Sequence, residues 1–375
     1  MVYVFIIILS FCLTVTVTAY KERYISKQTK WVLVLMIIAL AGIGACVEPK
    51  DTYDLFRHYE DIDSVRNSSY SLWSFLADGY RITDLNYKYT YAYDALIYII
   101  ARTLPNQALP FITILVTYGV FLYIILREFD EKHLTNRNIV ISMAIFSVLL
   151  PYLFVYSNIR NALAGAAVGY GIYRLYKDKN FPVFVICAVL AVLIHPIAVA
   201  VIPFILLSRI KPGVKGIIVT LAVPSLIFPV MEYFRLQLGN DFLFRIAAKY
   251  YNYTIVREDN QGRVFLYSTI AILVVIVVLA LWSNRDEKVA WKEKKYSLLN
   301  LIIWHAMFSL GYFRSYEMMT RLPYSIAFLS PVIVNTLFNR REMNTLGAQV
   351  AYIGSAVVIF ILAIIGLYEN IAWLI

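Results

Sequence analysis

The chain has 375 residues, of which 61% are hydrophobic and only 15% are charged, whereas about 25% of the residues in a soluble domain are charged. A water-soluble globule cannot bury that much apolar surface, so a soluble enzyme and a nucleic-acid-binding protein are both excluded. The formal net charge of +10 then indicates membrane topology rather than affinity for nucleic acid.

The apolar stretches predict an all-α, polytopic integral membrane protein. A helix needs about 20 apolar residues to cross a bilayer, and fewer where its ends snorkel. We therefore expect about 12 transmembrane segments. They are predicted at 1–19, 31–47, 109–126, 139–156, 159–175, 181–194, 197–208, 214–231, 264–282, 298–313, 321–338 and 346–367.

The basic residues predict which connections face the cytoplasm, because Lys and Arg gather on that side of a membrane protein. Six connections contain 20 of the 34 Lys and Arg residues but only 9 of the 24 Asp and Glu residues. They are 20–30, 127–138, 174–180, 209–215, 284–296 and 339–342. Both termini and two large loops, 48–91 and 232–263, are then expected outside.

The first outer loop begins with acidic and aromatic residues. Its segment 48–63 reads EPKDTYDLFRHYEDID, and Asp51 and Tyr53 are candidate substrate contacts because aromatic rings in outer loops can stack on sugar faces. The segment also contains a D-x-D pair, Asp61 and Asp63, a pattern that holds a divalent cation in some glycosyltransferases. A solvated acidic loop explains this pair better, so no metal site is predicted.

Residues 92–104, AYDALIYIIARTL, predict a short helix on the outer side. The parity of the crossings places both of its ends outside, and the stretch is too short to span a bilayer. Its apolar residues follow helical spacing, with Asp94 and Arg102 near its ends. This pattern favours an interfacial or re-entrant helix, and Asp94 is a further candidate substrate contact.

Arg160, in the sequence YSNIRNALAG, is predicted at an outer turn between two membrane segments. Ionisable groups at membrane depth are expensive and therefore suggest function. A guanidinium can bind two phosphate oxygens at once, so Arg160 is a candidate anion-binding residue. An arginine that snorkels to the interface is the alternative.

His195 is predicted at a turn within a long apolar stretch. Lys179 and Arg209 must lie on the same side of the membrane, yet the 29 residues between them are nearly all apolar. One continuous helix there would extend for about 43 Å and place every later basic loop outside, so the chain must turn, and His195-Pro196 is the turn signal. The resulting short helical hairpin leaves His195 in a recess, where it is suited to accept a hydroxyl proton as general base. A packed core histidine is the alternative.

The sequence RSYEMMTRLPY predicts another outer turn, with Arg314, Glu317 and Arg321 at roughly helical spacing. An ion pair within one helix explains the spacing, and further arginine contacts to the same anion are the functional alternative. His305, which lies in another apolar segment, is a weaker candidate for the same role as His195.

Four short motifs, in chain order, resemble the EpsG family, which belongs with the Wzy-type bacterial polysaccharide polymerases. They are DTYDLFRHYE, SNIRNALAG, VLAVLIHPIA and MMTRLPY. The resemblance implies a GT-C-like membrane glycosyltransferase that joins oligosaccharide repeat units carried on undecaprenyl diphosphate. It further implies inversion at the transferred sugar, with no nucleotide, metal or other cofactor.

The same resemblance implies a place in the bacterial inner (cytoplasmic) membrane, with the active site facing the periplasm or the outside. The expected substrates are a lipid-linked donor and a lipid-linked acceptor. A flippase and chain-length regulator proteins are the expected protein partners, and the product would be an O-antigen, capsule or exopolysaccharide.

Two other functions stay open at this point. A transporter or flippase would also be polytopic and basic inside, but it usually shows paired repeats. We find no internal repeat and predict one integral membrane domain over 1–375. A ligase that moves a finished glycan to another lipid would use the same chemistry as a polymerase.

Overall fold

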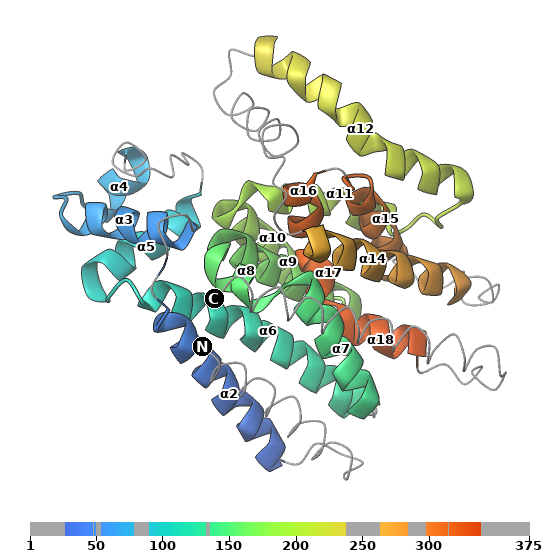
Figure 1. Ribbon diagram of the computed structural model, residues 1–375, viewed down its shortest axis with the longest axis horizontal. Coiled ribbons are helices and arrows are strands. Elements are labelled where there is room, and N and C mark those ends of the chain that lie inside the picture. Colours follow the sequence, from blue (N-terminus) through green and yellow to red (C-terminus); the bar gives the residue numbers. More distant parts are fainter. Residues whose placement is uncertain are drawn as a thin grey trace. The chain divides into compact units, whose positions relative to one another are not determined.

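The computed structural model describes residues 27–47, 49, 54–78, 90–132, 136–237, 263–283, 298–313 and 315–338. Every regular element within these ranges is helical, so the predicted all-α class is confirmed (Figure 1). The described helices form two compact units.

One helix in the described ranges, Ala108–Glu128, is long and apolar enough to cross a membrane. Several shorter apolar helices accompany it: Leu33–Ala45, Phe181–Ile194, Pro196–Leu207, Val214–Ile227, Leu266–Leu281 and Leu298–Leu310. The number of crossings and the outer position of the termini stay predictions, and the first and last predicted segments, 1–19 and 346–367, lie outside the described residues.

The first unit takes in the described chain up to Ser142 and the stretch Leu150–Val199. Its helices are α2 (Lys27–Ala45), α3 (Asp54–Arg66), α4 (Leu72–Asp78), α5 (Tyr91–Thr103), α6 (Ala108–Lys132), α8 (Tyr152–Ser157), α9 (Ile159–Asp178) and α10 (Phe181–Ile194). The predicted short outer helix is α5, one residue earlier than expected. The predicted outer loop 48–91, by contrast, contains two helices, α3 and α4, that the apolar pattern does not predict.

Helices α9 and α10 form a tight antiparallel hairpin. Lys179 ends α9 in the left-handed backbone region, with φ 56°, and the Asn180 side chain accepts a hydrogen bond from the Val183 amide at 3.1 Å to begin α10. A Cβ atom at Gly171 would lie 2.8 Å from Cβ of Cys187. The two helices can therefore approach this closely only because residue 171 has no side chain.

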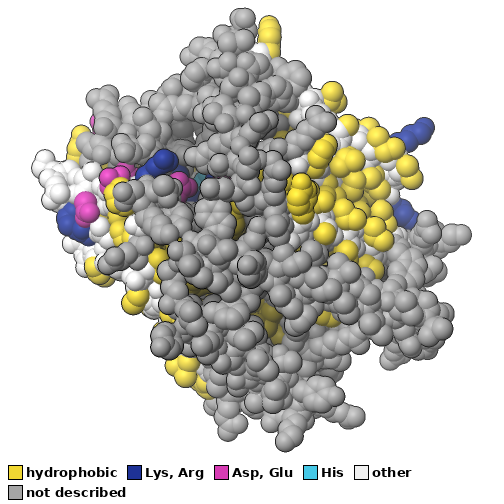
Figure 2. Space-filling view, in the orientation of Figure 1, with side chains coloured by type: hydrophobic (Ala, Val, Ile, Leu, Met, Phe, Trp, Pro, Cys, Tyr) yellow, Lys and Arg dark blue, Asp and Glu magenta, His cyan; other side chains and the backbone are white. Residues whose placement is uncertain are grey.

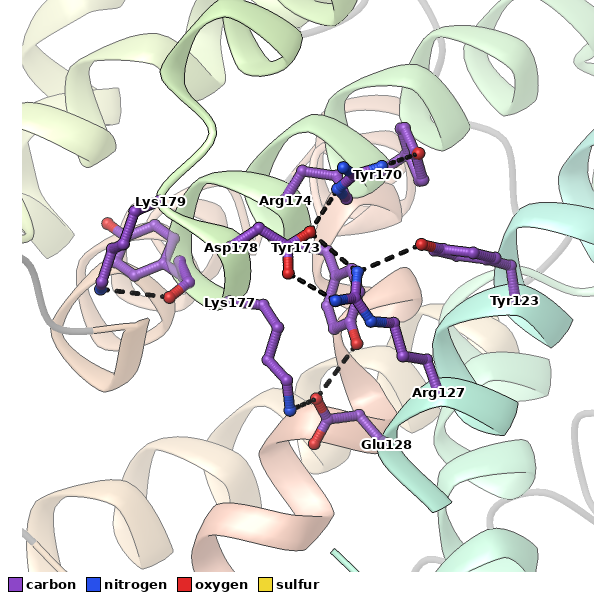
Figure 3. Close-up of polar contacts among 10 residues, drawn as sticks. Tyr123, Arg127, Glu128, Tyr170, Tyr173, Arg174, Lys177, Asp178 and Lys179 are labelled. Carbon is purple, nitrogen blue, oxygen red and sulfur yellow. Dashed lines mark hydrogen bonds and ion pairs between the residues drawn. The ribbon is translucent and has the colours of Figure 1, made fainter. Parts of the chain in front are cut away.

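A network of charged side chains joins the C-terminal end of α6 to that of α9 (Figure 3). Arg127 donates two hydrogen bonds to the Asp178 carboxylate, at 2.8 and 2.6 Å, and Arg174 pairs with the same carboxylate. The fully buried Glu128 accepts from Lys177 at 2.9 Å. These residues belong to two predicted cytoplasmic connections, and their pairing holds α6 against α9 at that end.

The second unit takes in Met143–Leu149 and the chain from Ala200 onward, and two elements, α7 (Asn136–Leu149) and η2 (Pro196–Val201), cross the division between the units. Its other helices are α11 (Ile202–Leu207), α12 (Val214–Gln237), α14 (Arg263–Ser283), α15 (Leu298–Leu310), α16 (Tyr316–Arg321), α17 (Tyr324–Phe328) and α18 (Ser330–Phe338). Two side chains of α15 hold the turn after α11, because Asn300 donates to the Ser208 carbonyl at 3.0 Å and Trp304 to the Ile210 carbonyl at 3.1 Å.

Two predicted continuous segments are interrupted in the structure. The stretch 139–156 breaks at Pro151, which has ψ 149° and separates α7 from α8. The stretch 321–338 is divided among α16, α17 and α18, with Pro323 between the first two. Proline has no amide hydrogen and restricts the residue before it, so a helix commonly ends there.

Apolar side chains also cover the outside of the second unit. Helix α12 exposes large hydrophobic residues along its length: Val214, Ile218, Val219, Leu221, Leu226, Val230 and Tyr233. Hydrophobic side chains form a patch on the visible face of the molecule (Figure 2). Apolar surface of this extent is typical of a protein whose surroundings are lipid rather than water.

Candidate functional site

Arg160 begins the candidate site in the first unit. It is the second residue of α9, directly after Asn158 and Ile159, where the chain enters the helix from a non-helical residue. Its side chain is only 6% exposed, and the guanidinium carbon lies 5.5 Å from the centroid of the Tyr93 ring. A buried arginine over an aromatic face is held in place by a cation–π contact, so the guanidinium is kept in a defined position.

The hydroxyl of Tyr93 is bonded in turn to His58. The Tyr93 oxygen lies 2.8 Å from Nδ1 of His58, and the two rings meet edge to face with centroids 5.4 Å apart. His58 is 1% exposed, and burial, together with the positive charges of Arg160 and Arg57, holds its pKa well below the usual value. The imidazole is therefore a neutral hydrogen-bonding partner that fixes the Tyr93 ring under Arg160.

Asp94 lies beside Tyr93 in the first turn of α5. Its carboxylate accepts a hydrogen bond from the Thr90 hydroxyl at 3.2 Å. Burial raises the pKa of Asp94 to about 7, and the Asp61 carboxylate acts in the same direction, while the Thr90 hydrogen bond and the Arg160 charge partly oppose the rise. Asp94 is thus a carboxyl group that binds and releases a proton near neutral pH.

Two arginines hold α3 and α5 together at their C-terminal ends. Arg66 of α3 donates to the carbonyls of Ala101 and Leu104, at 3.2 and 3.0 Å. Arg102 of α5 donates to the Arg66 carbonyl at 3.1 Å and to the Ser68 carbonyl at 2.9 Å. Each arginine satisfies carbonyls that the other helix end leaves open. The two helices therefore run in the same direction, which brings His58 beside Tyr93.

The two acids of the D-x-D pair lie in different surroundings. Asp61 is buried at 4% exposure within the cluster around Asp94. Asp63 instead accepts hydrogen bonds from Arg66, at 2.5 Å, and from Asn106, at 3.1 Å. Within the described ranges, no group of three or more metal-ligating side chains is present.

His195 directly follows α10, where the chain leaves the helix with φ −153° and ψ 124°. This confirms that the helix stops at the predicted His195-Pro196 signal. From Arg160 to the end of α9 the helix rises about 27 Å, and from the start of α10 to His195 about 21 Å. His195 therefore lies at the same end of the hairpin as Arg160. It is about 6 Å closer than Arg160 to the turn that joins the two helices at the other end.

The ring of His195 is 4% exposed, and its Nδ1 atom accepts a hydrogen bond from the Ile197 amide at 3.1 Å. An accepting Nδ1 atom carries no hydrogen, so the neutral ring carries its hydrogen on Nε2. In this conformation Nε2 carries the ring hydrogen and Nδ1 is occupied by the backbone amide of Ile197. The role of His195 as a general base stays a prediction, and it would require the bond to Ile197 to break.

Arg321 belongs to the second unit. It pairs with Glu317 one turn earlier in α16, and both side chains are almost completely buried. The ion pair within one helix, the simpler of the two interpretations of this spacing, is therefore present. Among the other candidates, Arg314, Asp51 and Tyr53 lie outside the described residues.

His305 is a core residue of the second unit. Its ring stacks on Phe204 with centroids 4.9 Å apart, and Nδ1 lies 3.4 Å from the Ser325 hydroxyl. The side chain is fully buried. Stacking and burial favour a packing role for this histidine over proton transfer.

The structure thus brings two sequence-predicted residues, Arg160 and Asp94, into one cluster and adds His58, Tyr93 and Asp61. The sequence places His58 within the predicted outer loop 48–91, whereas the structure buries it in α3. A helical pattern could have revealed this, because Leu55, His58, Ile62 and Val65 recur at intervals of three and four residues and all are buried.

Comparison with known families gives a match over most of the chain. Residues 29–374, nearly the whole chain, match the model of the EpsG family. No curated protein and no solved structure matches the chain.

Proposed function

The chain belongs to the EpsG family, a family of membrane proteins associated with polysaccharide polymerisation, and from this membership we propose that it joins lipid-linked oligosaccharide repeat units into a longer glycan. The substrates are a donor and an acceptor carried on undecaprenyl diphosphate. The reaction takes place on the outer face of the bacterial inner membrane, in the periplasm or outside the cell, and yields an O-antigen, capsule or exopolysaccharide.

The observation that supports this function best is the buried Arg160 beside Asp94. An arginine predicted on the outer side runs against the positive-inside trend, and an ionisable group at membrane depth commonly marks a functional site. The diphosphate of the donor is such an anion, and a guanidinium positioned by Tyr93 can bind two of its oxygens. Arg160 is therefore the residue that we assign to the leaving diphosphate.

The reaction needs little more than positioning and charge stabilisation. The bond from the donor sugar C1 to the diphosphate is already activated, and the diphosphate leaves with the bonding electrons. A cationic side chain stabilises the charge that develops on it without a metal or other cofactor. Direct attack by an acceptor hydroxyl from the opposite face inverts the configuration at C1, as expected for a GT-C-type enzyme.

The remaining candidates receive supporting roles. His195 keeps its proposed place in the catalytic site. While Nδ1 is bonded to the Ile197 amide it can only donate, through Nε2, and it can act as the predicted general base only where that bond breaks. The anion contacts proposed for Arg321 and Arg314, and the sugar contacts proposed for Asp51 and Tyr53, rest on the sequence alone. A flippase that delivers the substrate and chain-length regulator proteins are the proposed partners.

Purified protein incubated with a lipid-linked repeat unit in vesicles tests this function. A polymerase produces a ladder of products that differ by one repeat unit. A single transfer to a different lipid would instead identify a ligase. Movement of intact substrate across the vesicle membrane, with no covalent product, would identify a flippase.

A further inference from the structure

We propose that Asp94 is the catalytic base that accepts the proton of the attacking acceptor hydroxyl, next to the arginine that holds the diphosphate. This inference rests on the proposed function and extends it. The proposed reaction needs one proton acceptor near Arg160, and the bonded Nδ1 of His195 leaves that role open.

The position of Asp94 suits the role. It lies in the first turn of α5 and is only partly exposed, so an acceptor hydroxyl can reach it. The Thr90 hydroxyl, one turn earlier, donates to one carboxylate oxygen at 3.2 Å and leaves the other lone pairs free to accept. The Arg160 guanidinium lies 5.5 Å from the ring centroid of the adjacent Tyr93 and lowers the pKa of Asp94, so the proton acceptor and the anion-binding group share one site.

The other titratable groups of the cluster are unsuited to accept this proton. His58 is buried, and its Nδ1 atom is bonded to Tyr93. Asp61 is buried at 4% exposure. Of the acidic and histidine side chains around Arg160, Asp94 combines access from outside with the capacity to take a proton.

The electrostatic surroundings explain why Asp94 can act near neutral pH. Among the described residues, the charges that act on it are those of Arg160 of α9 and Asp61 of α3. Tyr93 of its own helix, and His58 of α3 bonded to Tyr93, are the neighbouring titratable groups. The segment Phe181–Ile194 of α10, which also packs on α5, contains no charged residue. Burial and Asp61 raise the pKa to about 7, and a base with such a pKa is strong enough to accept a proton while still being ionised at neutral pH.

The proton balance of the step is complete. The acceptor oxygen forms a bond to C1 of the donor sugar as its hydrogen passes to the Asp94 carboxylate. The bond from C1 to the diphosphate oxygen breaks, and the electron pair stays with the diphosphate, where Arg160 neutralises part of the charge. Asp94 then releases its proton to water before the next transfer.

The dependence of the polymerisation rate on pH tests this proposal. The wild-type rate should be low in acid, rise through about pH 7 and then level off, because the carboxylate form is the active one. Asp94→Asn should lower the rate per folded molecule by about 10²- to 10⁴-fold, and the residual rate should no longer rise through about pH 7. Glu60→Gln, on the exposed side of α3, is the matched control and should keep both the rate and the profile.

A second variant keeps the test independent of how well Asp94→Asn folds. Asp94→Ala leaves space for a small carboxylate, so added formate should restore part of its rate in proportion to its concentration, while Glu60→Gln should not respond. A flat wild-type profile, or an Asp94→Asn rate within a few fold of wild type with the rise intact, would overturn the assignment. A wild-type protein that forms no ladder at any pH would instead refute the proposed function itself.

Discussion

At the scale of single residues, the site depends on one chain of contacts. His58 fixes the Tyr93 hydroxyl, and the Tyr93 ring lies under Arg160. The sequence alone could identify Arg160 and Asp94, because charge in an apolar context is conspicuous. It could not identify the contact between His58 and Tyr93, because their packing depends on how α3 and α5 pair across 35 residues of chain.

Arg160→Lys should lower the polymerisation rate about tenfold or more, because a lysine keeps the charge but loses the paired contacts to the diphosphate. The loss of such contacts corresponds to roughly 1.5–3 kcal/mol. Arg57→Lys, at an exposed position of α3, is the control and should be neutral. Full activity in Arg160→Lys would mean that this arginine only anchors the helix.

Two substitutions at Tyr93 separate its ring from its hydroxyl. Tyr93→Phe keeps the ring under Arg160 but leaves the buried His58 nitrogen without its partner, so it should lower stability by about 1–3 kcal/mol and change the rate only a few fold. Tyr93→Leu also removes the cation–π contact and should reduce the rate much further. Equal rates in the two variants, corrected for folded protein, would contradict the positioning of Arg160 by the ring.

Asp94 should also make the protein less stable at neutral pH. Its folded pKa of about 7 lies above the usual aspartate pKa of 3.8, so the favourable contribution of the protonated form is lost as the pH rises between about 4 and 7. Asp94→Asn removes this loss and should therefore raise the melting temperature more at about pH 8 than at about pH 4.5. A melting temperature that drops equally at both values would mean that the carboxylate is well stabilised in the fold.

At the scale of elements, periodicity predicts the apolar helices but not their interruptions. Helices α5, α9 and α10 occur where the sequence predicts them, with the last ending at His195 as expected. The amphipathic helix α3 is not predicted, since membrane segments are recognised by apolar stretches and α3 is largely polar. Pro151 is a local signal for a break. It lies inside an apolar run, however, and the run by itself predicts one continuous segment.

The close contact of α9 and α10 can be tested at Gly171. Gly171→Ala places a Cβ atom 2.8 Å from Cβ of Cys187 and 3.5 Å from the Phe184 backbone, so it should lower stability by about 1–3 kcal/mol and reduce activity by separating the helices. Gly119→Ala in α6 meets no atom within 4 Å and should be neutral or stabilising by up to about 1 kcal/mol. Thermal unfolding of both variants, side by side, provides the comparison.

At the scale of the whole molecule, the sequence predicts the fold class and the family, and the structure and the family match confirm both. Hydrophobic periodicity does not determine the number of crossings, because several apolar helices are shorter than a bilayer is thick. The charge distribution makes a direct prediction of orientation. Single cysteines at Ser68 and Lys294 in a cysteine-free background should react oppositely with an impermeant maleimide in intact cells, and equal labelling would contradict the predicted topology.

The absence of any predicted metal site also leads to a prediction. Arginines in the proposed site supply the positive charge that a divalent cation would otherwise provide, so polymerisation should continue in EDTA. A loss of activity in EDTA that is restored by magnesium or manganese would bring Asp61 and Asp63 into the site as ligands.

The most direct test of the proposed function is the product distribution made by the purified protein from a lipid-linked repeat unit. The account predicts a ladder whose members differ by one repeat unit and lengthen with time, formed by wild type and by Arg57→Lys and strongly reduced in Arg160→Lys. A ladder of equal intensity in all three, or no extension beyond a single transfer in wild type, would contradict polymerisation at the Arg160 site.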